Sequence, residues 1–249
     1  MAHRYISLGS ACNAATMIRK AGLRRASYPF DWLLNVDDGL KAVSEIVRNN
    51  FEEASKPESY LVVFHPPAGR AVPTYKLYPK TFHVHSDPVA DPNHHAEMLR
   101  RFDRMREALR SRDHLHFLYY RDYSTYRESN PGTTAHEIVH IMEAEVLEFL
   151  ALVEGMRAGK TTVLVVVESL VEHEDETRSA VDSFTPSDNR LTFGKTVARY
   201  DEVPALNARW EREWINLLAR KTEMPFWMWL YCRLKQANRR IRTVYSPHR

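Results

Sequence analysis

The sequence is poor in cysteine and glycine, and both shortages exclude some classes of function. It holds two cysteines, Cys12 and Cys232, and eight glycines among its 249 residues. Two cysteines near opposite ends of a chain cannot form the disulfide framework of a small secreted domain, so reduced thiols are expected. The few glycines form neither a G-x-G-x-x-G fingerprint nor a Walker loop, which removes the commonest phosphate-binding motifs.

Long apolar runs are also missing. The longest runs, at 162–167 and 225–231, are far shorter than the roughly 20 apolar residues that a membrane-spanning helix needs. The first residues show no apolar stretch after a basic start, so no secretory signal is expected. Together with the reduced thiols, these features predict a cytoplasmic protein without a transmembrane segment.

Charge of one sign is not in large excess. The chain has 35 Lys and Arg against 32 Asp and Glu, which gives a formal net charge of +3. A charge this small neither demands nor excludes an anionic partner. We expect a single α/β domain over 1–249 with a basic C-terminal tail at about 233–249. The tail carries no base-reading motif, so no sequence-specific nucleic-acid partner is expected, and the oligomeric state stays open.

Predicted strands and helices alternate along the chain. The predicted strands are 4–8, 60–64, 75–78, 81–85, 115–120, 162–167 and 191–200. The predicted helices are 10–20, 39–49, 93–111, 134–156 and 205–221, whereas the acidic stretch 172–189 is predicted as a loop. This alternation favours a layered, mostly parallel central sheet flanked by helices, with a papain-like α+β arrangement as the alternative.

Three polar residues, Cys12, Asp122 and Glu168, each follow a predicted strand. In open parallel sheets, ligands bind at the carboxyl ends of the strands, so a site is expected there. Cys12 also begins a predicted helix, where backbone N–H groups and the positive end of the helix dipole stabilise a thiolate. The N–H groups of Cys12 and Asn13 can hold an oxyanion. Cys12 is therefore the candidate nucleophile, with a buried cysteine that only packs the turn as the alternative.

Three motifs near the N-terminus resemble a known family. They are Ser7-Leu-Gly-Ser-Ala-Cys-Asn, Arg19-Lys-Ala-Gly-Leu-Arg and Ser27-Tyr-Pro-Phe-Asp-Trp. This arrangement is similar to the opening signature of a family of papain-like cysteine peptidases, a domain of unknown function. The resemblance implies a cysteine-dependent hydrolase or acyltransferase in which Cys12 attacks a peptide, a small molecule or another acyl substrate, without a cofactor.

The resemblance also implies a histidine base. The family has a His-Asp-like element after an aromatic strand, and the matching stretch here is Thr81-Phe-His-Val-His-Ser-Asp. His85 is the first choice and His83 the second. Residues two apart on a strand share a face, so both are expected to point the same way. Asp31 of Pro-Phe-Asp-Trp is expected to orient the histidine, as in a catalytic triad, or alternatively to cap the turn that follows it.

Four further residues complete the expected site, near the substrate or the oxyanion. They are Ser10, Asn13, Asp87 and Trp32. A nucleophile between a strand and a helix also resembles SGNH-type esterases, which place a serine at the end of the first strand, and Ser10 lies close to that point. The chemistry can therefore be ester hydrolysis instead of proteolysis.

The sequence His136-Glu-Ile-Val-His140 offers a different chemistry. On a helix, His136 and His140 share one face and can hold zinc, with Glu137 as the general base. The candidate third ligands are Glu143, Glu145 and Glu168. A solvated face of an outer helix is the structural alternative. A zinc-dependent hydrolase and a non-catalytic binding module therefore remain alternatives to the cysteine hydrolase.

Overall fold

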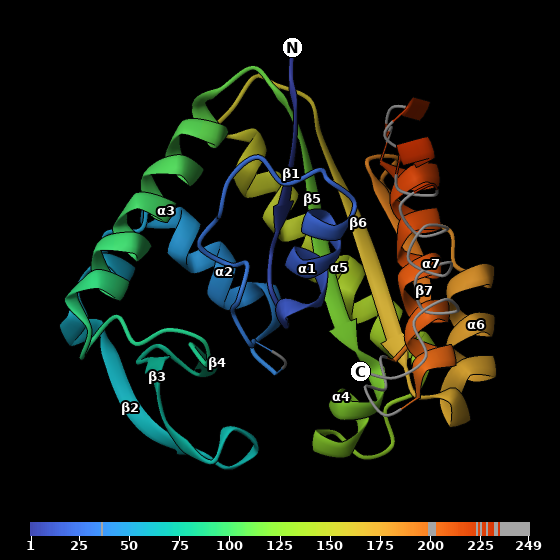
Figure 1. Ribbon diagram of the computed structural model, residues 1–249, viewed down its shortest axis with the longest axis horizontal. Coiled ribbons are helices and arrows are strands. Elements are labelled where there is room, and N and C mark those ends of the chain that lie inside the picture. The colour runs from blue at the N-terminus through green and yellow to red at the C-terminus, as the bar shows by residue number, and fades with distance from the viewer. Residues whose placement is uncertain are drawn as a thin grey trace, which may run out of the picture.

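A computed structural model describes residues 1–35, 37–198, 203–222, 224, 226–227, 229–231 and 234. Within these ranges the chain forms one sheet of four strands and one of three, with helices around them (Figure 1). No helix in these ranges is long and apolar enough to cross a membrane. Cys232 and, apart from Leu234, the predicted basic tail lie outside the described residues.

The larger sheet is entirely parallel, with strand order β1-β5-β6-β7. Its strands are β1 (His3–Ser7), β5 (His114–Asp122), β6 (Thr161–Ser169) and β7 (Leu191–Val197). The two central strands, β5 and β6, are buried along nearly their whole length, as is typical of strands covered on both faces. The predicted layered, mostly parallel α/β sheet is confirmed.

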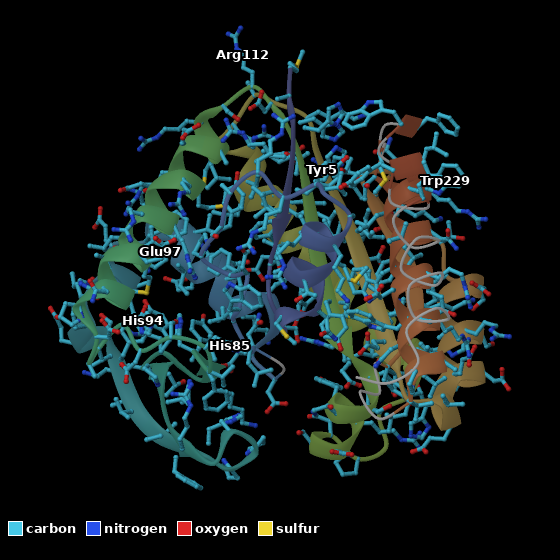
Figure 2. All side chains as sticks on the ribbon, viewed as in Figure 1. Tyr5, His85, His94, Glu97, Arg112 and Trp229 are labelled. Carbon is cyan, nitrogen blue, oxygen red and sulfur yellow. The ribbon has the colours of Figure 1, made fainter. Side chains whose placement is uncertain are left out.

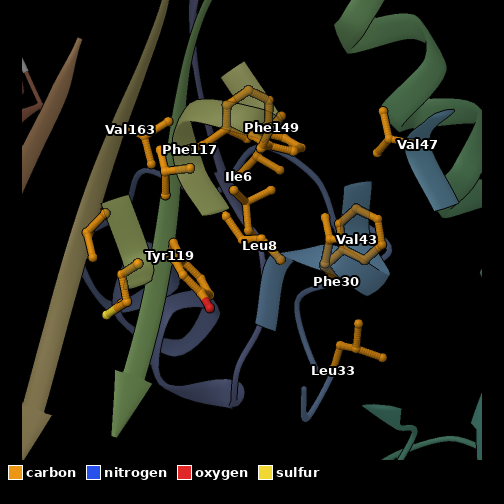
Figure 3. Packing of buried hydrophobic residues seen from close by; sticks show 14 of the residues in the cluster. Ile6, Leu8, Phe30, Leu33, Val43, Val47, Phe117, Tyr119, Phe149 and Val163 are labelled. Atoms are coloured by element: carbon orange, nitrogen blue, oxygen red, sulfur yellow. The ribbon is translucent and has the colours of Figure 1, made fainter. Parts of the chain in front are cut away.

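Helices cover both faces of this sheet. The helices are α1 (Cys12–Lys20), α2 (Gly39–Arg48), α3 (Pro92–Arg110), α4 (Tyr123–Ser129), α5 (Ala135–Glu154), α6 (Glu174–Ser183) and α7 (Pro204–Lys221). Short 3₁₀ turns cover Glu53–Ser55, Pro57–Ser59, Pro66–Ala68 and Val171–His173. Side chains alternate along β1, so that Ile6 joins the core under α2, α3 and α5 while Tyr5 joins the core under α1 and α7. Figure 3 shows Ile6, Phe117 and Phe149 packed together in the larger of these cores.

The smaller sheet is antiparallel and lies beside the carboxyl ends of the large sheet (Figure 1). Its strands are β2 (Tyr60–His65), β3 (Arg70–Tyr75) and β4 (Tyr78–Phe82). A β-bridge between Leu34 and Phe82 ties it to the loop that contains the Pro-Phe-Asp-Trp motif. Because β4 ends at Phe82, His83 and His85 come after the strand, and the prediction that they share a strand face is wrong.

The acidic stretch 172–189 was predicted as a loop, and that prediction is also wrong, because it contains α6. This helix buries Thr177, Ala180 and Val181 as a short apolar stripe. Its first turn holds three acidic side chains, which interact favourably with the positive end of the helix dipole. The stripe is too short to stand out from the surrounding charge in the sequence. Helix α4 was not predicted either, and its start is fixed by the side chain of Asp122.

Candidate functional site

The turn between β1 and α1 places Cys12. Strand β1 ends at Ser7, Gly9 and Ser10 take positive φ angles of 85° and 54°, and α1 begins at Cys12. A Cβ atom on Gly9 would lie 2.6 Å from Asn35 Oδ1, so glycine is required there. A positive φ is uncommon for serine, and such strain is often found at functional turns.

Asn35, which is fully buried, holds this turn in place. Its Oδ1 accepts a hydrogen bond of 2.7 Å from Ser10 N, and its Nδ2 donates one of 2.5 Å to the carbonyl oxygen of Gly39, where α2 begins. Asn35 is not among the residues predicted for the site. The only signal in the sequence is its place three residues after Trp32 of the Pro-Phe-Asp-Trp motif.

Cys12 is partly buried and lies at the first position of α1. The residue before it, Ala11, is the N-cap and has no side-chain oxygen to offer to the N–H groups of the first turn. These N–H groups and the helix dipole favour an anion at this position. Cys12 Sγ lies 3.9 Å from Asn13 Oδ1, and Asn13 Nδ2 donates a hydrogen bond of 3.2 Å to Glu168 Oε1.

Glu168 is a buried carboxyl group at the end of β6, next to this helix start. Besides the Asn13 contact, it accepts hydrogen bonds of 2.8 Å from the Tyr120 hydroxyl and 2.6 Å from Trp210 Nε1. Burial raises the pKa of Glu168 to about 8, although these donors favour the carboxylate and hold the pKa lower than burial alone would. Tyr120 and Trp210 are not among the predicted site residues, because only the folded sheet brings them to Glu168.

Asp122 lies beside Glu168 in the register of β5 and β6. Its Oδ1 accepts hydrogen bonds from Ser124 N at 2.9 Å and Thr125 N at 3.2 Å, which caps α4. Burial raises the pKa of Asp122, and its negative charge contributes to the raised pKa of Glu168. Asp122 therefore combines a structural role as a cap with an electrostatic effect on Glu168.

His85 is exposed, and its ring meets the edge of the Trp32 ring at 5.5 Å between centroids. The guanidinium carbons of Arg19 and Arg24 lie 6.0 and 5.7 Å from the Trp32 ring centroid. Since Arg19 belongs to α1, Trp32 connects His85 to the helix that begins at Cys12. Figure 2 shows His85 between the small sheet and the four-stranded sheet.

His83 packs differently. Its ring meets the edge of Tyr60 at 5.4 Å between centroids, and its backbone N–H bonds to the carbonyl oxygen of Pro73 in the small sheet. Burial, together with the positive charge of Arg101, lowers the pKa of His83 to about 4. His83 is therefore a neutral, packed side chain at neutral pH.

Asp31, the candidate triad acid, and Asp87, expected near the substrate, both have local partners. Asp31 is buried and forms an ion pair of 2.7 Å with Arg24, and its Oδ2 also accepts from Tyr28 N at 3.0 Å. Burial raises the pKa of Asp31, while Arg24 counters that rise. Asp87 Oδ1 accepts hydrogen bonds from the backbone N–H groups of the two residues that close its own turn. Asp31 thus fixes the loop that carries Trp32.

The His136 motif lies on the exposed face of α5. Glu137 forms a capping box with Thr134, because its Oε2 accepts from Thr134 N at 2.7 Å and Oγ1 at 2.9 Å. His140 packs edge-on against Phe184 at 5.1 Å between centroids. In the described part of the chain, no third ligating side chain joins His136 and His140. The capping box accounts for the glutamate of the motif.

Comparisons with known proteins identify the family of the chain. A model of the family described as "putative papain-like cysteine peptidase" matches residues 3–167. A stretch of 48 residues is 40% identical to an uncharacterised protein of Acanthamoeba polyphaga mimivirus, covering 19% of this chain and 21% of the viral protein. No solved structure matches. Since the family model spans more than half of the chain and includes the Cys12 turn, the chain belongs to the family of putative papain-like cysteine peptidases.

Proposed function

We propose that the protein is a cysteine-dependent hydrolase of acyl substrates, with Cys12 as the nucleophile. The observation that carries this proposal is the place of Cys12, at the first position of α1 and just beyond the carboxyl end of β1. A thiolate there gains from the N–H groups and the helix dipole. Membership of a family described as cysteine peptidases supports the same reading. The substrate is a peptide or another acyl compound.

The reaction proceeds in two steps. The thiolate of Cys12 attacks the carbonyl carbon of the substrate, a C–S bond forms, and the leaving group departs with a proton supplied by a histidine. Water then attacks the thioester, gives its proton back to the histidine and releases the acid. The backbone N–H groups of Cys12 and Asn13 hold the oxyanion in both steps.

His85 is the proposed base. It is exposed, so it can reach a bound substrate, and its contact with Trp32 places it beside a side chain that also meets Arg19 of α1. Hydrogen bonds between catalytic groups are often long in unliganded enzymes and shorten when substrate binds. In contrast to His85, His83 packs against the small sheet, which makes it the weaker candidate.

Asp31 is proposed as a positioning residue. Its ion pair with Arg24 fixes a guanidinium group that lies over the Trp32 ring, and Trp32 in turn contacts His85. This chain of contacts differs from the direct carboxylate–imidazole bond of a triad. It gives Asp31 an indirect influence on the base, through the orientation of Trp32.

The test is the pH dependence of iodoacetamide labelling, followed peptide by peptide, with Cys232 as an internal reference. Cys12 is expected to label rapidly well below pH 8, and His85→Ala is expected to slow that labelling. His94→Ala removes another exposed histidine and serves as the matched control. Labelling of Cys12 with an apparent pKa at or above about 8.5, the value of free cysteine, would contradict the proposal.

The same variants are then assayed on ester, thioester and peptide substrates. Cys12→Ala is expected to abolish turnover and Cys232→Ala to leave it unchanged. Hydrolysis that survives Cys12→Ala at the wild-type rate would assign the activity to another group.

A further inference from the structure

Three histidines gather at the end of the parallel sheet opposite to Cys12. His3 and His114 begin β1 and β5 and are direct partners in the register. His116 lies two residues further along β5 and therefore on the same face as His114. One ring nitrogen of each histidine lies within 4.8 Å of those of the other two. Adjacent parallel strands thus bring three imidazole ligands to one point.

The rings are packed closely enough to share one ion. His3 Nδ1 lies 2.8 Å from His116 Nε2, and the two rings are nearly parallel, with an interplanar angle of 9°. The centroids of His114 and His116 are 3.8 Å apart. Ligand nitrogens lie roughly 2.0–2.1 Å from a zinc ion, so nitrogens around one tetrahedral ion are about 3.3 Å apart. The 2.8 Å between His3 Nδ1 and His116 Nε2 is shorter than this spacing, so these two rings must move apart when an ion binds.

Thr162 of β6 contacts the rings of His114 and His116. Its hydroxyl oxygen lies 2.9 Å from His116 Nδ1 and 3.3 Å from His114 Nε2. A hydroxyl can accept from both ring N–H groups. That arrangement leaves the lone pair on His116 Nε2, the nitrogen that faces His3. Hydrogen bonds of this kind orient the histidine ligands of metal sites and fix their tautomers.

The three histidines differ in their exposure to solvent. His114 and His116 are buried, whereas His3 is only partly covered and provides a path for an ion from solvent.

We propose that His3, His114 and His116 form a binding site for a divalent transition-metal ion, with zinc as the reference ion. Three imidazoles suit zinc, copper and nickel, whereas magnesium and calcium prefer oxygen ligands. A water molecule completes a tetrahedral set. The ion ties the N-terminal ends of β1 and β5 together and lies far from Cys12 along the sheet, so it takes no part in the proposed hydrolysis.

The test uses the full chain, stripped of metal with a chelator and titrated with zinc chloride by calorimetry. One zinc per chain is expected for the wild type, and His3→Ala is expected to weaken binding at least tenfold. The double variant His136→Ala/His140→Ala removes the other histidine pair and is expected to bind zinc as the wild type does. His3→Gln provides a second variant if His3→Ala does not fold.

Two further readings make the outcome decisive. Cobalt is expected to give the intense visible bands of a tetrahedral site in the wild type, and these bands are expected to be absent in His3→Ala. Zinc is expected to raise the melting temperature of the wild type and of the double variant but not that of His3→Ala. Binding that appears only at millimolar zinc, or that survives in His3→Ala and is lost in the double variant, would overturn the proposal.

Discussion

Asn13 donates a hydrogen bond of 3.2 Å from its Nδ2 to Glu168 Oε1, and so ties the first turn of α1 to the carboxyl end of β6. The same amide places its Oδ1 3.9 Å from the Cys12 sulfur. A single side chain therefore connects the thiol to a buried carboxyl group whose pKa is raised to about 8. A change in the protonation of Glu168 is therefore expected to change the reactivity of the Cys12 thiol.

Replacement of Asn13 is expected to make Cys12 more acidic. An oxygen that accepts a hydrogen bond from S–H favours the neutral thiol, so its removal in Asn13→Ala lowers the pKa of Cys12. The shift is expected to be a fraction of a unit, because the contact is long. The measurement is the pH profile of iodoacetamide labelling. An unchanged or raised apparent pKa in Asn13→Ala would show that the amide does not act on the thiol in this way.

Glu168 is expected to give folding stability an unusual pH dependence. Its pKa is about 8 in the folded protein, against 4.5 for a glutamate in water, so the folded state holds one more proton between these values. Stability is therefore expected to fall as the pH rises from about 4.5 to 8, by at most about 1.4 kcal/mol per unit. Glu168→Gln, which cannot titrate, is expected to reduce this slope in urea unfolding.

Glu137→Gln is the control for that experiment. Glu137 is exposed, and glutamine also completes a capping box, so this variant is expected to keep the wild-type slope. Equal slopes in the wild type and Glu168→Gln would mean that Glu168 is ionised throughout the range.

Asn35 is expected to be a large contributor to stability near the site. Asn35→Ala leaves the buried N–H of Ser10 and the carbonyl of Gly39 without the bonds that Asn35 makes. Each of the two lost bonds to a buried group costs about 1–3 kcal/mol, so a loss of about 2–6 kcal/mol is expected from denaturant unfolding. A loss below about 1 kcal/mol would show that water or a local shift replaces both bonds.

Ser10→Gly is expected to act in the opposite direction. Ser10 has φ 54°, which costs a non-glycine residue about 1 kcal/mol or more and glycine almost nothing. The gain is offset in part by the greater freedom of glycine in the unfolded chain. The expected result is a stability equal to or slightly above wild type. A clear destabilisation would indicate that the Ser10 side chain makes a contact that matters more than the strain.

Arg121 and Glu145 form a buried ion pair on the face of the large sheet that is opposite to α1. The Arg121 side chain is fully buried, its Nη2 lies 3.3 Å from Glu145 Oε2, and its guanidinium lies 4.9 Å from the centroid of the Tyr126 ring. Removing one partner strands a buried charge, so Glu145→Ala is expected to cost about 3–5 kcal/mol. The double variant Arg121→Met/Glu145→Met is expected to cost less stability than the sum of the single variants Arg121→Met and Glu145→Met. Additive effects in this double-mutant cycle would contradict strong coupling.

Much of the large sheet could be predicted from the sequence, because β6 contains a continuous apolar, β-branched run and β5 is mostly apolar and aromatic. An apolar run of this kind can be recognised in the sequence itself. Helix α6 could not be predicted in the same way, since its buried stripe is short and its surroundings are acidic. Its helical form depends on packing against the sheet.

Only part of the candidate site could be predicted from the sequence. Cys12 and Glu168 were expected at one edge because parallel strands bring their carboxyl ends together. The roles of the histidines depend on where β4 ends and how the small sheet meets the loop at Trp32, and neither is encoded in local pattern. Asn35 and Trp210 reach the site from distant parts of the chain, which only the tertiary structure shows.

The name of the family describes an activity, whereas the architecture of this chain describes its fold. The described residues form a parallel sheet with helices on both faces, and its nucleophile candidate follows the first strand. Unrelated folds can carry the same nucleophilic chemistry, so a papain-like activity does not require a papain-like sheet. The match gives the family of the chain, and the structure gives its fold.

The family match ends at Val167, inside β6 and one residue before Glu168. A chain cut at that boundary would lose β7 and leave β6, still paired with β5, as an edge strand with one open side, which is a template for aggregation. It would also lose Trp210, which covers the carboxyl end of that strand. Shortened forms prepared for crystallisation should therefore extend at least through α7, even though the family signature does not require it.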